Sequence, residues 1–216
     1  MENLSKIQEA LMAGKVGEIK EIVQSCLDSR LTPQTIINDG FIPGMAEVGK
    51  KFKSMEIWVP EVLMAAKTMQ LGMDVLAPLV EKTGGLKKVG KVMLGTVYGD
   101  SHDIGKNLVG MMLSGGGYEV VDIGENVSAD KFVEDAIKIQ PDIIGMSALL
   151  STAIPRIKET VTALRNGQIS KPFKTIIGGA AVSQLTADES GADAYASDAA
   201  VAVEVINDLM KMISTG

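Results

Sequence analysis

The stretch KVMLGTVYGDSHDIGKN, residues 91–107, begins as a short β-prone run and ends in a polar, glycine-containing turn. Runs of the same kind recur four more times, at residues 118–124, 142–148, 173–179 and 193–197. Helical stretches of ten to fifteen residues separate them, such as 128–140 and 154–166. Strands that alternate with helices are typical of right-handed βαβ units in a parallel sheet covered on both faces. The sequence therefore predicts an α/β fold with a doubly wound five-stranded sheet.

The first ninety or so residues differ, because their apolar positions recur only at helical spacing. Thr32 followed by Pro33 is typical of a helix N-cap with proline in the first turn. We expect breaks at Gly14, Gly40, Gly44 and 83–85, and four helices that begin near residues 4, 16, 32 and 58. The sequence thus predicts a four-helix bundle domain over residues 1–88 and the sheet domain over residues 89–216.

Composition excludes several classes of protein. The chain has 216 residues, of which 46% are hydrophobic and 22% charged, so it is long and apolar enough for a real core. Its net charge of −6 argues against a nucleic-acid surface, which needs clustered lysine and arginine. No stretch resembles a signal peptide or a membrane span. The single cysteine, Cys26, lies on an apolar helical stripe and fits a core thiol in a reducing cytoplasm. We therefore expect a cytoplasmic protein with neither nucleic acid nor membrane as partner.

Three unusual segments are expected to meet at one edge of the sheet. In a sheet of order 2-1-3-4-5, ligands bind beyond the carboxyl ends of the strands where the order reverses. The loop after the first strand contains Gly99–Gly105, and the loop after the third contains Ser147–Ser151. The fourth strand ends at Gly178-Gly179. This convergence predicts a single binding site.

His102, the only histidine, has several possible roles. A phosphate-binding P-loop fails, since Gly99–Gly105 is one residue too long and Asn107 replaces the hydroxyl residue. No dinucleotide fingerprint follows the first strand, and no nucleophile elbow occurs. A zinc site needs more ligands than His102 and Cys26 provide. A metal that takes one protein imidazole because a macrocycle supplies its other ligands remains possible, with Asp100 as partner of the ring. The alternative is a local hydrogen-bonded turn.

These residues resemble a known family. Asp100–Gly105 is similar to the D-x-H-x-x-G motif of cobalamin-binding domains, Ser147-Ala148-Leu149 to their S-x-L, and Gly178-Gly179 to their GG. The helical half is similar to the four-helix cap that precedes this domain in cobalamin-dependent methionine synthase. The resemblance covers nearly the whole chain. It is strongest to the stand-alone corrinoid proteins of methyl-transfer systems.

The resemblance implies that cobalamin binds base-off, with its benzimidazole released from cobalt and buried in a slot of the Rossmann-like (flavodoxin-like) domain. His102 would replace that base as the lower axial ligand of cobalt, and Asp100 would set its tautomer. Ser147 would hydrogen-bond the buried base and Leu149 would line its slot. Further cofactor contacts are expected, by matching position, at Gly99, Ser101, Asp103, Ile104, Gly105, Ser151, Gly178, Gly179 and Ala199.

Trp58, the only tryptophan, matches an aromatic residue of the family's cap, so we expect it to cover the upper face of cobalt. Its helical face continues through Val62 and Met69, for which bundle core is the preferred interpretation. One position departs from the pattern of methionine synthase, where a hydroxyl residue contacts the aspartate of the His-Asp pair. Ala153 stands there in this chain, which puts a proton relay in doubt.

The function that the resemblance implies is that of a methyl carrier, a transferase component rather than a complete enzyme. Methyl groups would pass from a substrate-specific methyltransferase to cobalamin (as Co(I), giving methylcobalamin). A second methyltransferase would then pass them to tetrahydrofolate or a coenzyme thiol, as in one-carbon metabolism. A corrinoid reactivation protein is a further expected partner, and the segment GLKKVG, residues 85–90, is a predicted hinge. The alternatives are a cobalamin-binding sensor, the binding half of a cobalamin mutase, or a flavodoxin-like domain with another ligand.

Overall fold

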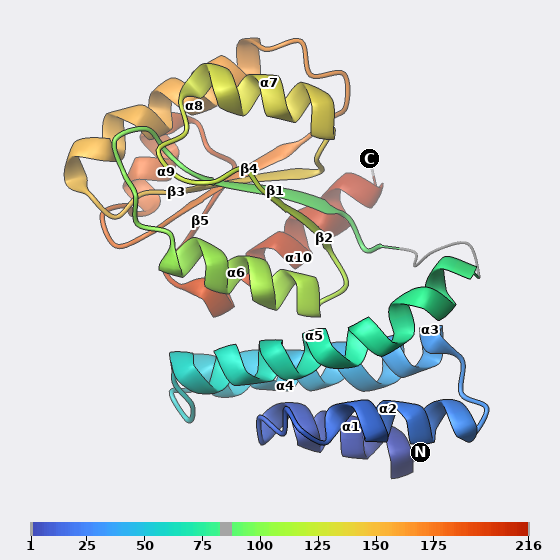
Figure 1. The fold of residues 1–216 in the computed structure, drawn as a ribbon. Helices are drawn as coiled ribbons and strands as arrows, with labels where there is room; N and C mark the ends of the chain where they lie inside the picture. The colour runs from blue at the N-terminus through green and yellow to red at the C-terminus, as the bar shows by residue number, and fades with distance from the viewer. Residues whose placement is uncertain (1, 83–87, 216) are drawn as a thin grey trace. The chain divides into compact units, whose positions relative to one another are not determined.

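The computed structural model describes residues 2–82 and 88–215, which form two compact units (Figure 1). The first comprises residues 1–88 with 115–117, and the second residues 89–114 with 118–216. No helix in these described ranges is long and apolar enough to cross a membrane. Of the predicted hinge, all but residues 88–90 lies outside the described residues.

The first unit is helical, as predicted. Its helices are α1 (Glu2–Met12), α2 (Ile19–Asp28), α3 (Pro33–Thr35), α4 (Ile42–Lys53) and α5 (Val59–Lys82). A π-helical segment, Ile36–Phe41, joins α3 to α4 without a break. Fully or almost fully buried apolar side chains from all four long helices form its core, among them Ile7, Leu11, Ile19, Val23, Cys26, Phe41, Val48, Val62 and Leu76. The predicted core positions of Cys26, Val62 and Met69 are therefore confirmed.

The start of α3 is confirmed too, because the Thr32 hydroxyl accepts a hydrogen bond from the Thr35 amide at 3.1 Å. The breaks predicted at Gly40 and Gly44 are wrong, since both lie inside the continuous helical segment. Packing explains these glycines: a Cβ at Gly44 would lie 2.6 Å from Leu11 Cδ1, and one at Gly40 would lie 3.2 Å from Ile7 Cδ1. They let α1 approach closely. The break predicted at residues 83–85 lies outside the described residues.

The second unit is a five-stranded parallel sheet. Its strands are β1 (Lys91–Thr96), β2 (Glu119–Asp122), β3 (Ile143–Ser147), β4 (Lys174–Gly178) and β5 (Ala194–Ala196). Their order is β2-β1-β3-β4-β5, and each neighbouring pair is parallel, which confirms the predicted topology. The helices are α6 (Ile104–Gly115), α7 (Ala129–Ile139), α8 (Ile154–Asn166), α9 (Gln184–Ser190) and α10 (Ala199–Thr215).

The two faces of the sheet carry separate apolar clusters. Met93, Ile144 and Ile177 pack with residues of α7, α8 and α9 on one face. Leu94, Ile143 and Ile176 pack with residues of α6 and α10 on the other face. Figure 1 shows α7 and α8 on one side of the sheet and α6 and α10 on the opposite side. Since side chains of a strand alternate between faces, Gly145, Ser147 and Gly178 share the face that α6 and α10 cover.

Candidate functional site at the carboxyl edge of the sheet

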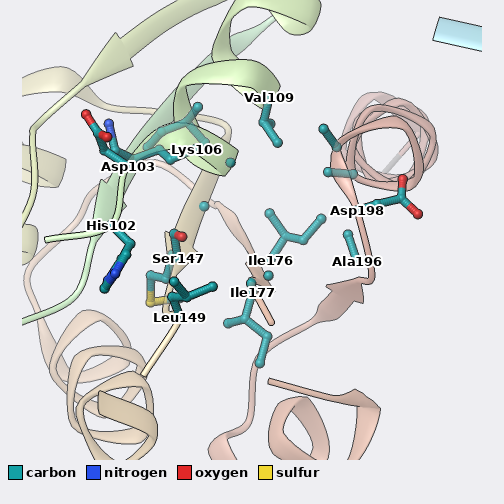
Figure 2. Close-up of a pocket in the computed structure, with 18 of the residues that line it drawn as sticks. His102, Asp103, Lys106, Val109, Ser147, Leu149, Ile176, Ile177, Ala196 and Asp198 are labelled. Atoms are coloured by element: carbon teal, nitrogen blue, oxygen red, sulfur yellow. The ribbon is translucent and has the colours of Figure 1, made fainter. Parts of the chain in front are cut away.

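A pocket of about 420 Å³ opens at the carboxyl ends of the strands, between the sheet and helices α6 and α10. Figure 2 shows His102 on one side and Ala196 and Asp198 on the other, with Ser147, Leu149, Ile176 and Ile177 between them. The three predicted segments therefore meet. The predicted site residues that line the pocket are Ser101, His102, Asp103, Ile104, Gly105, Ser147, Leu149, Gly178, Gly179 and Ala199.

His102 is held by the buried carboxylate of Asp100. Its Nδ1 lies 2.7 Å from Asp100 Oδ1, which also accepts the His102 amide at 3.0 Å. The second oxygen, Oδ2, accepts the amides of Leu149 at 2.6 Å and Leu150 at 2.9 Å. Asp100 thus ties the loop after β1 to the loop after β3. The local hydrogen-bonded turn of the alternative interpretation is present, and the bonds to Leu149 and Leu150 add a tertiary link to it.

Charge and tautomer depend on this network. Burial by itself would raise the pKa of Asp100, but the hydrogen bonds from His102, Leu150 and Leu149 outweigh it and lower the pKa to about 2. The ionised carboxylate can only accept, so the proton it shares with the ring resides on His102 Nδ1. The lone pair of Nε2 is then free, and the side chain is 50% exposed. His102 can therefore offer Nε2 as a single nitrogen ligand.

Asn126 positions the same loop, although the sequence did not single it out. Its side-chain Oδ1 accepts the Gly99 backbone amide at 2.8 Å, and its backbone amide donates to the Asp100 carbonyl at 2.9 Å. Asn126 has a φ of 54° and Gly99 a φ of 82°, in the left-handed region that asparagine and glycine tolerate. The Thr96 hydroxyl donates to the His102 carbonyl at 3.2 Å. These hydrogen bonds hold the loop from both flanks.

Lys106, also not predicted, lines the pocket with a nearly buried side chain. Its ammonium donates to Asn107 Oδ1 at 2.9 Å and pairs with Asp122. Asn107 in turn donates to Asp103 Oδ2 at 2.8 Å. A buried charge needs such partners, and the network attaches the first turn of α6 to the end of β2.

The inner part of the pocket, which we call the slot, is lined by buried or partly buried residues that are apolar or small. Its side chains come from the strands and from α6 and α10: Leu94, Val109, Gly145, Ile176, Ala196, Ala202 and Ile206. Sequence reasoning did not single them out, although Ala199, Ala202 and Ile206 recur at helical spacing. At Gly145 a Cβ would lie 2.5 Å from Leu94 Cδ2, so the wall there is already at van der Waals contact.

The remaining predicted residues take varied positions. Gly99 and Asp100 do not line the pocket and lie in the supporting loop, while Ser151 is exposed in a 3₁₀ turn, Ser151–Ala153. Ala153, which stands where a relay would need a hydroxyl residue, is buried. The Asp100 carboxylate accepts hydrogen bonds from backbone amides and from the His102 ring, so its hydrogen bonds with described residues involve no hydroxyl group. Trp58 belongs to the helical unit, where its 64% exposure excludes the bundle core.

The three predicted glycines that line the pocket, Gly105, Gly178 and Gly179, differ in why glycine is needed there. Gly179 has a φ of 117°, and a Cβ there would lie 2.2 Å from the Ala148 carbonyl oxygen. The chain's own backbone therefore demands glycine at this position. A Cβ at Gly105 would meet nothing within 4 Å, which leaves open space beside His102. A Cβ at Gly178 would come within 3.3 Å of the Ala196 carbonyl oxygen.

The site fits cobalamin. Ile104 and Leu149, which are 76% and 41% exposed, line the outer part of the pocket together with His102, and we call this part the mouth. The Ser147 hydroxyl has no hydrogen bond to another described residue and can bind one polar atom of a ligand. The described residues contain no cluster of three or more metal-ligating side chains, so a metal held here needs other ligands. Together these features define a site that has the room and the donor group for a large metal macrocycle.

Comparison with known proteins agrees. Residues 90–204 and 4–77 match two families, each described as a B12 binding domain. A corrinoid protein of Desulfitobacterium hafniense is 38% identical over 97% of this chain and 98% of its own length. A dimethylamine corrinoid protein of Methanosarcina acetivorans is 37% identical, over 97% and 98% respectively. The chain belongs to the family of cobalamin-binding corrinoid proteins, and its cofactor is cobalamin.

Solved structures support the same family. A cobalamin-binding protein of Desulfitobacterium hafniense superposes with a TM-score of 0.78 and 32% identity, over 95% of this chain and 98% of that one. The methanol:cobalamin methyltransferase complex of Methanosarcina barkeri contains a chain with a TM-score of 0.86 and 28% identity. That match covers 97% of this chain and 80% of the other.

Proposed function

We propose that this protein carries methyl groups between two methyltransferases, with cobalamin bound base-off and His102 as the lower ligand of cobalt. The observation that carries the proposal is the Asp100–His102 pair, whose ring presents a free Nε2 at the mouth of an apolar slot. The names of relatives support the carrier role. They include dimethylamine and trimethylamine corrinoid proteins and a methanol:cobalamin methyltransferase complex.

Each residue of the site has a distinct part in this proposal. His102 Nε2 holds the metal, while Asp100 keeps the proton on Nδ1 and makes the ring a stronger donor. Ser147 hydrogen-bonds the detached base, and the slot keeps that base away from water. Gly105 and Gly178 leave room for the nucleotide tail. Ala199 lines the same pocket. The bound cobalamin supplies the carbon–cobalt chemistry, which the protein orients and shields.

Two further parts of the proposal concern the helical unit. Trp58, with its exposed ring, covers the upper face of cobalt in the resting protein. Methyl transfer also requires that a methyltransferase reach the metal, which the helical domain must permit. The first partner delivers the methyl group from its own substrate. The second passes it to tetrahydrofolate or a coenzyme thiol, and a reactivation protein restores the reduced cofactor.

Cofactor binding is tested by mixing the purified protein with hydroxocobalamin and recording its visible spectrum. Wild type and Thr162→Ala, a change in an exposed residue of α8 outside the pocket, should bind one equivalent with an imidazole-ligated spectrum. His102→Ala should lose the imidazole features. Identical spectra for wild type and His102→Ala would contradict the assignment of the ligand.

The carrier role needs a second assay on the loaded, reduced protein. Isotope-labelled methylamines or methanol are supplied together with the methyltransferases that act on each of them. Label that stays with the protein through gel filtration, and that appears with only one donor, would identify the partner. A protein that retains cobalamin but gains label from none of these donors would favour the sensor alternative.

A further inference from the structure

We propose that the slot selects among cobamides by the chemistry of their lower base, accepting bases of the benzimidazole class and rejecting purines. The inference rests on the proposed base-off mode, in which that base enters the slot. It goes further by assigning a specificity to residues of the slot wall, none of which belongs to the His102 motif.

Polar side chains are distributed unevenly around the pocket. Of the lining residues that the described strands contribute, only Ser147 has a polar side chain. The other polar lining residues lie in the loop after β1, in the first turn of α6, or just before α10, and all but Ser101 already have partners. Asp198, for example, accepts the Ser197 hydroxyl at 3.0 Å and the Val201 amide at 2.9 Å. The slot therefore offers a ligand one free hydroxyl.

The backbone adds little to this. β1, β3 and β4 are each paired with a strand on both sides, so their amides and carbonyls bond within the sheet. The helical wall presents Val109, Ala202 and Ile206, whose side chains cannot form hydrogen bonds. A ligand atom that needs a partner beyond Ser147 finds none among these groups.

The chemistry of the lower base determines which cobamides suit such a slot. Dimethylbenzimidazole, once detached from cobalt, has one free ring nitrogen, and its remaining edge is apolar. The Ser147 hydroxyl can satisfy that nitrogen, and the apolar edge suits the slot. Adenine has further ring nitrogens and an exocyclic amino group, which would lose their water without gaining partners. Each buried polar group left unpaired is unfavourable, because the binding site must first remove its water.

The test measures equilibrium dissociation constants of the full chain for three corrinoids by dialysis and cofactor absorbance. They are cobalamin, the cobamide that carries adenine as lower base, and cobinamide, which lacks the nucleotide tail. We expect the wild-type constant for the adenine cobamide to exceed that for cobalamin at least about tenfold, ~1.4 kcal/mol. Ser147→Ala should weaken cobalamin binding and leave cobinamide binding unchanged.

A matched pair of variants separates selection by the slot from properties of the free cofactors. Val109→Thr places a hydroxyl on the slot wall, and Val205→Thr makes the same change in the same apolar cluster outside the pocket. We expect Val109→Thr to narrow the ratio of the two constants at least about threefold, and Val205→Thr to leave it unchanged. Ala202→Ser serves the same purpose if Val109→Thr does not fold.

The outcomes are distinguishable. If the dissociation constants for cobalamin and the adenine cobamide agree within about twofold, and both are lower than that for cobinamide, selection by the slot is overturned. The base-off proposal would stand in that case. If cobalamin has the same dissociation constant as cobinamide, the base does not enter the slot. That result would overturn the base-off proposal as well.

Discussion

The mouth of the pocket and the slot behind it are built by opposite means. At the mouth, hydrogen bonds fix the loop that carries His102: the carboxylate of Asp100 accepts four donors, and Asn126 holds the segment before it. In the slot, the walls are apolar and include small residues such as Ala196 and Ala202. The orientation of a ligand therefore depends on polar contacts at the mouth. The shape of ligand that the slot accepts depends on the small, apolar residues of its walls.

The largest effect on stability is expected at Gly179, a glycine that has no room for a side chain. Gly179→Ala forces a Cβ to within 2.2 Å of the Ala148 carbonyl oxygen at a φ of 117°. We expect a loss of about 4 kcal/mol in the free energy of unfolding, from backbone strain and overpacking together. Thermal unfolding should show a midpoint lower by roughly 10 °C.

Gly191→Ala is the matched control. Gly191 also has a positive φ, 77°, but a Cβ there meets nothing within 4 Å. It should lose only about 1 kcal/mol. Equal losses in the two variants would show that the contact with Ala148 does not matter.

The second largest effect on stability is expected at Asp100, which fixes the loop at the mouth. Asp100→Ala removes the acceptor of three backbone amides and of the His102 ring, so we expect a loss of about 3 kcal/mol in the free energy of unfolding. Cobalamin binding should weaken as well, because His102 is no longer oriented. Denaturant unfolding and cofactor titration measure the two effects. Asp103→Ala, which loses one side-chain contact to Asn107, should be much milder, and similar losses in both variants would contradict the special role of Asp100.

Asn126 sharpens the comparison, because it supports the mouth without lining the pocket. Asn126→Ala should cost about 1.5 kcal/mol of unfolding free energy, through the lost bond to Gly99 and the strained φ of 54°. Asn126→Gly relieves the strain but not the lost bond. If the side chain positions the His102 loop, both variants should weaken cobalamin binding, measured by titration. A loss in Asn126→Ala that Asn126→Gly fully restores would assign the effect to strain alone.

The smallest effect lies outside the pocket. Asp193 accepts the Thr175 amide and hydroxyl and pairs with Lys174 and Arg165. Burial by itself would raise its pKa, but these partners lower it. A lowered folded-state pKa means that the stabilisation is complete above the unfolded value, ~3.9, and is lost as the pH falls through the folded value.

Asp193→Asn should therefore lower the free energy of unfolding by about 1 kcal/mol at neutral pH. The difference from wild type should shrink below about pH 4. Urea unfolding across that pH range checks both statements. A difference that stays constant with pH would contradict the role of the charge.

The sequence predicted the mouth better than the slot, for a physical reason. His102, Asp100 and Ser147 lie in short segments at the ends of strands, and parallel topology brings such ends together. Lys106 pairs with Asp122 and Asn126 with Gly99, and because these partners are distant in sequence, no local pattern indicates the two residues. The slot depends on which faces of α6 and α10 meet the sheet, and no prediction from the sequence addressed this.

The helical unit teaches the same lesson from its glycines. Gly40 and Gly44 were predicted to end helices, because glycine has a low helix propensity. They lie inside a helix, where α1 packs too closely for a side chain. Tertiary packing overrode local propensity, and the π-helical segment at residues 36–41 was likewise not predicted.

The central claim is that the ring of His102 binds cobalt. Because His102 is the only histidine, growth on nitrogen-15 histidine labels a single imidazole. Electron paramagnetic resonance of the protein loaded with divalent cobalt corrinoid then reports the axial nitrogen. We predict that the hyperfine splitting changes from the natural nitrogen pattern to that of nitrogen-15 on labelling. A splitting that labelling leaves unchanged would mean that the cofactor keeps its own base on cobalt, and would contradict the assignment of His102.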